Sequence, residues 1–137
     1  MNSFQKTVDL LHRSMSAQVV RRSVIANNMA NANVPNFKRS MVNFESELKR
    51  ALETEKQKPA LELTQTNPMH FSNYRERDYR DVQIRRVLDY TNTYNNNGNN
   101  VDPEQEFTAL VENQMAYMLL AQSIDFQFNQ VNQVLRN

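Results

Sequence analysis

The final segment of the chain, from Asp102 to Asn137, carries one uninterrupted helical pattern, and it limits the possible folds more than any other feature. Asp102 suits the N-cap position, Pro103 suits the first helical turn, and Gln105 stands three residues after the cap. No glycine or further proline follows Pro103. We therefore expect a helix of about 34 residues, which is a rod about 50 Å long.

Apolar side chains recur along this helix at alternating steps of three and four residues, as in the seam of a coiled coil. The seam consists of Phe107, Leu110, Gln114, Tyr117, Ala121, Ile124, Phe128, Val131 and Leu135. Further apolar residues lie off this seam, at Val111, Met115, Met118, Leu119, Leu120 and Phe126. One partner helix cannot cover both sets, so the pattern favours association with other chains. The alternative is an antiparallel helical hairpin in which the middle of the chain covers the surplus.

A second long helix is expected from about Asn2 to Asn33. Its stripe consists of Phe4, Val8, Leu11, Met15, Gln18, Arg22, Ile25, Met29 and Ala32. Asn2 and Gln5 suit a capping pair, Pro35 ends the helix, and Asn33 suits the left-handed conformation that often follows a helix. We expect the two terminal helices to pack on each other as a coiled-coil-like pair.

The middle of the chain is less regular. Met41 to Gln57 has the composition of a short helix, and Pro59 ends it. Short strands are expected at Leu61 to Thr64, Val82 to Ile84 and Arg86 to Leu88, of which the last two can pair, with a turn at Asn67-Pro68 and a polar loop from Thr91 to Asn100. The expected fold class is mainly α, with a small irregular insert containing short β-strands. The expected divisions are residues 1–36, 37–101 and 102–137.

The residue types argue against catalysis and against a bound metal. The chain has no cysteine, and its two histidines, His12 and His70, have no second ligand at metal-binding spacing. Phosphate-binding, dinucleotide-binding and nucleophile-elbow motifs are absent. We therefore expect no catalytic, cofactor-binding or metal-binding residues.

Charge and hydropathy argue against nucleic acid as a partner and against a membrane-spanning segment. The net charge is only +1, and acidic residues interrupt the basic cluster of Arg75, Arg77, Arg80, Arg85 and Arg86. A solvated surface or salt bridges between subunits explain that cluster better than nucleic acid does. The longest apolar run, Ala116 to Ala121, is too short to span a bilayer, and the amino terminus has no continuous apolar core typical of a cleavable signal peptide.

A block near the end of the first helix resembles a known signature. Residues 26–39 read ANNMANANVPNFKR, which is similar to the A-N-N-[LI]-A-N-x-x-T-P-G-[YF]-K signature of the flagella basal body rod protein family. The matching residues are Ala26, Asn27, Asn28, Met29, Ala30, Asn31, Pro35, Phe37 and Lys38. Val34 replaces the usual Thr, and Asn36 replaces the usual Gly while still tolerating a positive φ. From the residues alone, these amides suit either a polar helix end or a packed junction between subunits.

A second block precedes the last helix. Gly98, Asn99, Asn100, Val101 and Asp102 resemble the D-G-N-N-V-D sequence of the proximal-rod members of the family, with Asn97 in place of the first Asp. Further matches to those members stand at Glu106, Asn113, Gln114 and Tyr117. The intervening segment carries no comparable signature.

The resemblance implies a structural subunit of the flagellar basal body, in the periplasmic rod, that is exported by the type III apparatus and assembles through its terminal helices into a helical, torque-transmitting lattice. The implied neighbours are rod subunits of the FlgC, FlgF and FlgG type, FliE and the MS-ring protein FliF. It also implies a short export element, which Phe44 and Leu48 fit, as does the segment from Phe37 to Met41. The purely structural alternative is that Phe44, Leu48 and Leu52 form one helix face packed on the subunit's own core. The alternative for the whole chain is a cytoplasmic coiled-coil adaptor that dimerises.

Overall fold

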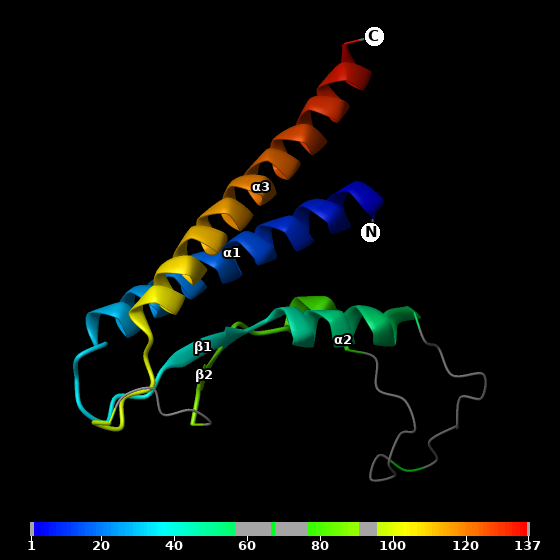
Figure 1. Cartoon of the computed structure of the whole chain (residues 1–137). Coiled ribbons are helices and arrows are strands. Elements are labelled where there is room, and N and C mark those ends of the chain that lie inside the picture. The colour runs from blue at the N-terminus through cyan, green and yellow to red at the C-terminus, as the bar shows by residue number, and fades with distance from the viewer. Residues whose placement is uncertain (1, 57–66, 68–76, 91–95, 137) are drawn as a thin grey trace. The chain divides into compact units, whose positions relative to one another are not determined.

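The computed structural model describes residues 2–56, 67, 77–90 and 96–136. Its elements are α1 (Ser3–Ala30), β1 (Ser40–Asn43), α2 (Glu45–Lys56), the 3-10 helix η1 (Tyr79–Asp81), β2 (Arg85–Leu88) and α3 (Pro103–Leu135), as Figure 1 shows. The expected mainly α fold, with long terminal helices and a small insert containing strands, is confirmed. The chain divides into a helical unit, Met1–Val42 with Arg86–Asn137, and a middle unit, Asn43–Arg85.

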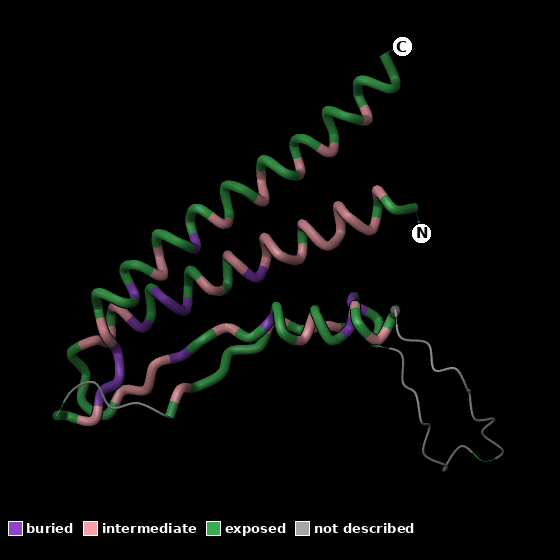
Figure 2. Tube along the Cα trace, turned by 45° about the vertical axis from the view of Figure 1, so that its right-hand side comes forward, coloured by how far each residue is buried: buried purple, intermediate pink, exposed green. Residues whose placement is uncertain are grey.

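The helical unit is built on an antiparallel pair of α1 and α3. Asn28, near the end of α1, donates a hydrogen bond to Glu106 near the start of α3 at 3.2 Å. At the opposite ends of the helices, the rings of Phe4 and Phe128 meet edge to face with centroids 5.9 Å apart. In both views the helices lie closest at the end where α1 finishes and α3 begins, and the buried positions also gather there (Figures 1 and 2). The pair is therefore packed most tightly at the end where the two connecting segments meet.

The start of α3 is confirmed in detail. The Asp102 carboxylate accepts hydrogen bonds from the backbone N–H groups of Glu104, at 3.0 Å, and Gln105, at 3.4 Å. Pro103 occupies the first turn, where its missing N–H costs nothing. Local sequence is sufficient to begin this helix.

The two ends of α1 differ from expectation. Asn2 makes no side-chain cap, because both Asn2 and Gln5 are exposed and water can satisfy the first N–H groups. The helix ends at Ala30, and the positive φ that turns the chain is at Asn36, at 61°, rather than at Asn33. The turn lies later because Asn36 directs its N–H to the carbonyl oxygen of Asn97 at 3.1 Å.

The packed face of α3 is displaced from the seam read in the sequence. Its buried and half-buried positions include Glu106, Leu110, Asn113, Leu120, Ile124, Gln127 and Val131. The seam positions Phe107, Gln114, Tyr117, Phe128 and Leu135 are instead exposed. The displacement arises because polar residues with polar partners occupy inward positions, which a purely apolar pattern passes over. On α1 the expected stripe is buried or half-buried, except for the exposed Arg22.

The strands also pair differently. The segment from Ser40 to Asn43 forms β1, so the short helix begins at Glu45 rather than Met41. β2 pairs with β1 in a two-stranded sheet, and not with Val82 to Ile84. Val82 ends η1 instead, with its N–H directed to the carbonyl of Tyr79 at 3.4 Å. The strand expected at 61–64, the residues Pro59, Pro68, His70 and Arg75, and loop residues 91–95 lie outside the described part of the chain.

Within the middle unit, α2 and η1 contact each other. Phe44, Ala51 and Tyr79 are buried, and an ion pair joins Arg77 to Glu47 at 3.5 Å. Asp78 caps η1 by accepting a hydrogen bond from the N–H of Arg80 at 2.9 Å.

The cap of α3 gives a first prediction. Asp102→Ala removes the acceptor for two N–H groups and should lower the free energy of unfolding by about 1 kcal/mol. Asp102→Asn keeps an acceptor oxygen and should lose only a few tenths of that amount. Urea unfolding followed by circular dichroism measures both, and equal losses in the two variants would show that the cap does not stabilise the helix.

Candidate functional site: a buried polar junction

The two sequence blocks that resemble the rod signature are far apart in the chain but in contact in the structure. The Nζ of Lys38 donates to the carbonyl oxygen of Gly98 at 2.8 Å. The N–H of Asn36 donates to the carbonyl oxygen of Asn97 at 3.1 Å. Both blocks lie at the same end of the α1–α3 pair (Figure 1). We call the residues 28, 36–40, 97–102 and 106 the junction.

The side chain of Asn99, in the second block, forms hydrogen bonds with the turn that follows α1. Its side chain is fully buried. Its Nδ2 lies within hydrogen-bonding distance of the carbonyl oxygens of Asn31 at 3.0 Å, Ala32 at 2.9 Å and Val34 at 2.8 Å. Its Oδ1 accepts from the N–H of Val101 at 2.7 Å. These carbonyls belong to the turn that follows α1, so Asn99 fixes that turn from a segment that is distant in the sequence.

Asn28 ties α1 to β1 and to α3. Its Nδ2 donates to the carbonyl oxygen of Ser40 at 2.8 Å and to Oε2 of Glu106 at 3.2 Å. Its Oδ1 accepts from the N–H of Ser40 at 3.0 Å. The amide therefore has a partner at each end, as a buried polar group requires.

Glu106 places a carboxylate in the interior of the junction, with a side chain that is 0% exposed. Its Oε1 accepts from Nε of Arg39 in an ion pair, and its Oε2 accepts from Asn28. Burying a carboxylate is costly unless the charge is paired and hydrogen-bonded, and both conditions are met here. Asn100 holds the backbone of the same arginine: the Oδ1 of Asn100 accepts a hydrogen bond from the backbone N–H of Arg39 at 2.6 Å.

A positive φ, together with a close side-chain neighbour, explains the single glycine of the chain. Gly98 has a φ of 78°, and a Cβ built on it would lie 2.6 Å from Oδ1 of Asn36. Asn36 itself has a φ of 61°, which confirms that asparagine can serve where the family signature has glycine.

The outward face of α3 carries exposed apolar side chains. We call this set the outer stripe, which consists of Phe107, Val111, Met115, Met118, Leu119 and Phe126. At 3.6 residues per turn these residues fall on one face of the helix, opposite the residues packed against α1. Met115 is 61% exposed and Leu119 is 63% exposed. Such a contiguous apolar surface is typical of an interface with other chains.

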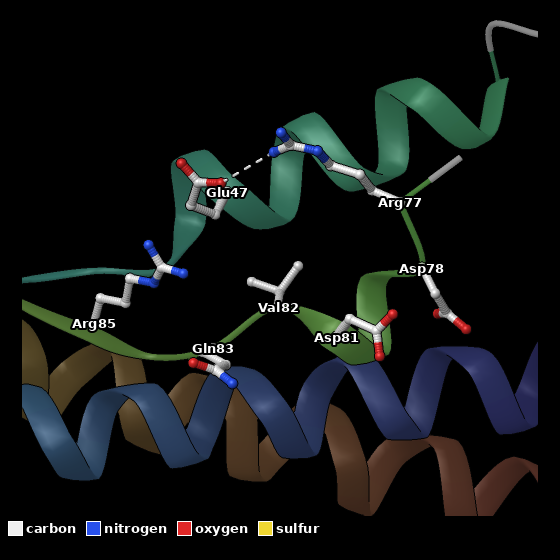
Figure 3. Close-up of a pocket in the computed structure, with 7 residues that line it drawn as sticks. All are labelled: Glu47, Arg77, Asp78, Asp81, Val82, Gln83 and Arg85. Atoms are coloured by element: carbon white, nitrogen blue, oxygen red, sulfur yellow. Dashed lines mark ion pairs between the residues drawn. The ribbon is translucent and has the colours of Figure 1, made fainter. Parts of the chain in front are cut away.

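The middle unit contains a pocket of about 450 Å³ with a charged lining (Figure 3). Glu47, Arg77, Asp78, Asp81 and Arg85 line it together with Val82 and Gln83. Ligand sites are usually mostly apolar with a few converging polar groups, and this lining is the reverse. In the part of the chain that the structure describes, no group of three or more acidic or histidine side chains is placed to hold a metal.

Comparison with known proteins identifies the family. The family model described as "Flagella basal body rod protein" matches residues 12–38. The flagellar basal body rod protein FlgB of Borreliella burgdorferi is 45% identical over 99% of this chain and 100% of its own length. The FlgB of Bacillus subtilis is 31% identical over 98% of this chain and 97% of its own length.

The chain belongs to the FlgB family of flagellar basal body rod proteins. It is accordingly a structural rod subunit of the flagellar basal body and not an enzyme. The comparisons give no support to a cytoplasmic dimerising adaptor. Among the described helices, none is long and apolar enough to cross a membrane.

The FlgB-like signature residues divide by burial. Those inside the junction are buried, namely Asn28, Asn99, Asn100 and Val101. Half-buried residues surround them, namely Met29, Asn31, Phe37, Lys38, Gly98 and Asp102. The exposed ones are Ala26, Asn27, Ala30 and Pro35. The ion pair of Arg39 with Glu106 was not predicted from the sequence. A basic residue at the end of the first block and an acidic residue shortly after the second block could have predicted it.

Asn99 gives the second prediction. Asn99→Asp keeps the acceptor for Val101 but sets a carboxylate oxygen against three carbonyl oxygens, so the free energy of unfolding should fall by about 3 kcal/mol or more. Asn97→Asp is the matched control, because its Oδ1 only accepts, from the N–H of Asn99 at 3.1 Å, and it should be neutral. Urea unfolding of both variants tests this, and equal stability of the two would show that Asn99 does not stabilise the turn that follows α1.

Proposed function

We propose that this subunit enters the proximal rod by packing the outer stripe of α3 against helices of neighbouring subunits. The observation that carries the proposal is the position of the outer stripe on the face of α3 that α1 leaves uncovered. Burying a Leu, Met or Phe side chain contributes about 1.5–3 kcal/mol. A row of such residues is therefore sufficient to drive association once the subunit meets a complementary helix.

The partners are proposed from the same surface. Two of the six residues of the outer stripe are methionines, Met115 and Met118, whose flexible side chains adapt to non-identical neighbours. That property suits contacts with rod subunits of the FlgC, FlgF and FlgG type, with FliE and with the MS-ring protein FliF. Contacts between different faces of successive subunits do not close into a small ring, so they build the helical lattice that a drive shaft needs.

A charge in the outer stripe tests the proposal. Met118→Asp with Leu119→Asp should leave the subunit folded, because both positions are exposed, with a change in unfolding free energy within about 0.5 kcal/mol. Motility of a strain that carries only this variant should be lost, since an unpaired charge opposes burial in the interface.

Gln105→Asp with Ser123→Asp is the matched control, because both side chains are exposed on α3 and lie outside the arc of the helix that the outer stripe covers. The control should support motility. Normal swimming by cells with the Met118 and Leu119 variant would rule out the outer stripe as the assembly surface. Ile124→Asp is less informative, because Ile124 is half-buried in the subunit itself.

We also propose that Phe44 and Leu48 act as the export element. Phe44 is 2% exposed, so it is accessible to an export apparatus only in the unfolded chain. Phe44→Ala should reduce the secreted fraction severalfold, but it also removes core contacts worth about 3–5 kcal/mol. Leu52→Ala, on the same face of α2, is the control for lost packing. The proposal fails if the two variants are secreted equally when circular dichroism shows equal folding.

A further inference from the structure

Two buried polar residues interrupt the packed face of α3. Glu106 and Asn113 are one heptad apart, and each meets a polar side chain of α1. Glu106 pairs with Asn28, while Asn113 pairs with Gln18. The structure therefore contains two polar layers between helices whose other inward positions are largely apolar.

The second layer lies in the middle of the helix pair. Asn113 is 5% exposed. Its Nδ2 donates to Oε1 of Gln18 at 2.6 Å and lies 3.1 Å from the carbonyl oxygen of the same residue. Arg21 donates to the same Oε1 at 2.9 Å. The hydrogen bonds of Asn113 are thus satisfied by one particular turn of α1.

Apolar contacts alone do not select one alignment of the two helices. Leu110, Ile124 and Val131 on the packed face stand at multiples of seven residues, and Tyr117, which is exposed, occupies the same heptad position, so sliding α3 by one heptad, about 10 Å, still sets apolar residues against α1. The same slide toward the start of α1 carries Asn113 from Gln18 to the level of Leu11. It also removes Glu106 from Asn28 and Arg39, and leaves buried polar groups without partners.

We propose that Glu106 and Asn113 are positioning residues that set the register of α3 against α1. In coiled coils a single buried polar residue can specify register at a cost in stability, and here two act one heptad apart. The register in turn determines the level at which the outer stripe is presented to a neighbouring subunit. That last step rests on the proposed assembly function, whereas the register itself does not.

The absence of cysteine from the chain makes register measurable by cross-linking. Phe4→Cys with Phe128→Cys reports the observed register, since the two rings are in contact. Phe4→Cys with Ala121→Cys reports a slide of one heptad. The purified full chain is treated at low concentration with a short bifunctional thiol reagent, and intramolecular products are counted by mass spectrometry.

Glu106→Leu with Asn113→Leu converts both polar layers to apolar ones. The partners on α1 keep other hydrogen bonds, because Asn28 remains bonded to Ser40 and Gln18 to Arg21. The matched control is Glu112→Leu with Gln114→Leu, which makes a closely similar chemical change at exposed positions of α3. Circular dichroism should show that both variants remain helical.

When α3 is otherwise unchanged, and in the control, the cross-link between positions 4 and 128 should exceed the cross-link between positions 4 and 121 by about tenfold or more. This ratio corresponds to the free-energy cost of leaving one buried polar group without a hydrogen bond. In the Glu106 and Asn113 variant the two products should approach equal amounts. If that variant loses its helices, Asn113→Leu alone is measured instead and should still lower the ratio severalfold. A fall in melting temperature with an unchanged ratio would overturn the proposal, because these residues would then only stabilise the pair.

Motility of the same variant, without the added cysteines, tests the consequence for assembly. Loss of motility together with an altered register supports the link, and normal motility with an altered register refutes it. Failure of the assembly proposal itself is recognised separately, from normal motility of the Met118 and Leu119 variant.

Discussion

The buried carboxylate of Glu106 is the constraint on which the rest of the helical unit depends. A charge without solvent needs a cation and hydrogen-bond donors, and the chain supplies them from two other segments, through Arg39 and Asn28. Arg39 is held in turn by Asn100, and the strand next to it is held by Asn28. Satisfying one ionised group therefore requires the end of α1, the start of β1 and the start of α3 to meet in one arrangement.

Features that depend on neighbours in sequence were predictable, and features that depend on distant segments were not. The cap of α3 at Asp102 follows from local residue types and was expected. The turn that follows α1 was not, because Asn99 and Asn97 hold it from a segment more than sixty residues away. The pairing of β1 with β2 likewise follows contacts between distant segments.

The packed face of α3 shows why hydrophobic periodicity can misplace an interface. Phe107 and Gln114 fitted the apolar seam, yet their neighbours Glu106 and Asn113 are the buried residues. A helix with apolar residues on two faces offers two possible seams, and polar pairing decides which face turns inward. The other apolar face of the helix stays exposed. The residues that look like a misplaced core in the isolated chain are the surface by which we propose that a rod subunit associates.

This division suits a rod subunit that packs its own two helices together and also associates with other subunits. If the inward face of α3 were wholly apolar, the two faces would compete for α1, and subunits would be free to pack with either one. Polar layers on the inward face favour α1 as its partner, because α1 supplies the complementary amides of Asn28 and Gln18 in the required positions. The outer stripe carries no such restriction, so it remains free to meet neighbours of different sequence. Buried polar groups that add little net stability can thus determine which surface packs within the subunit and which stays exposed for association.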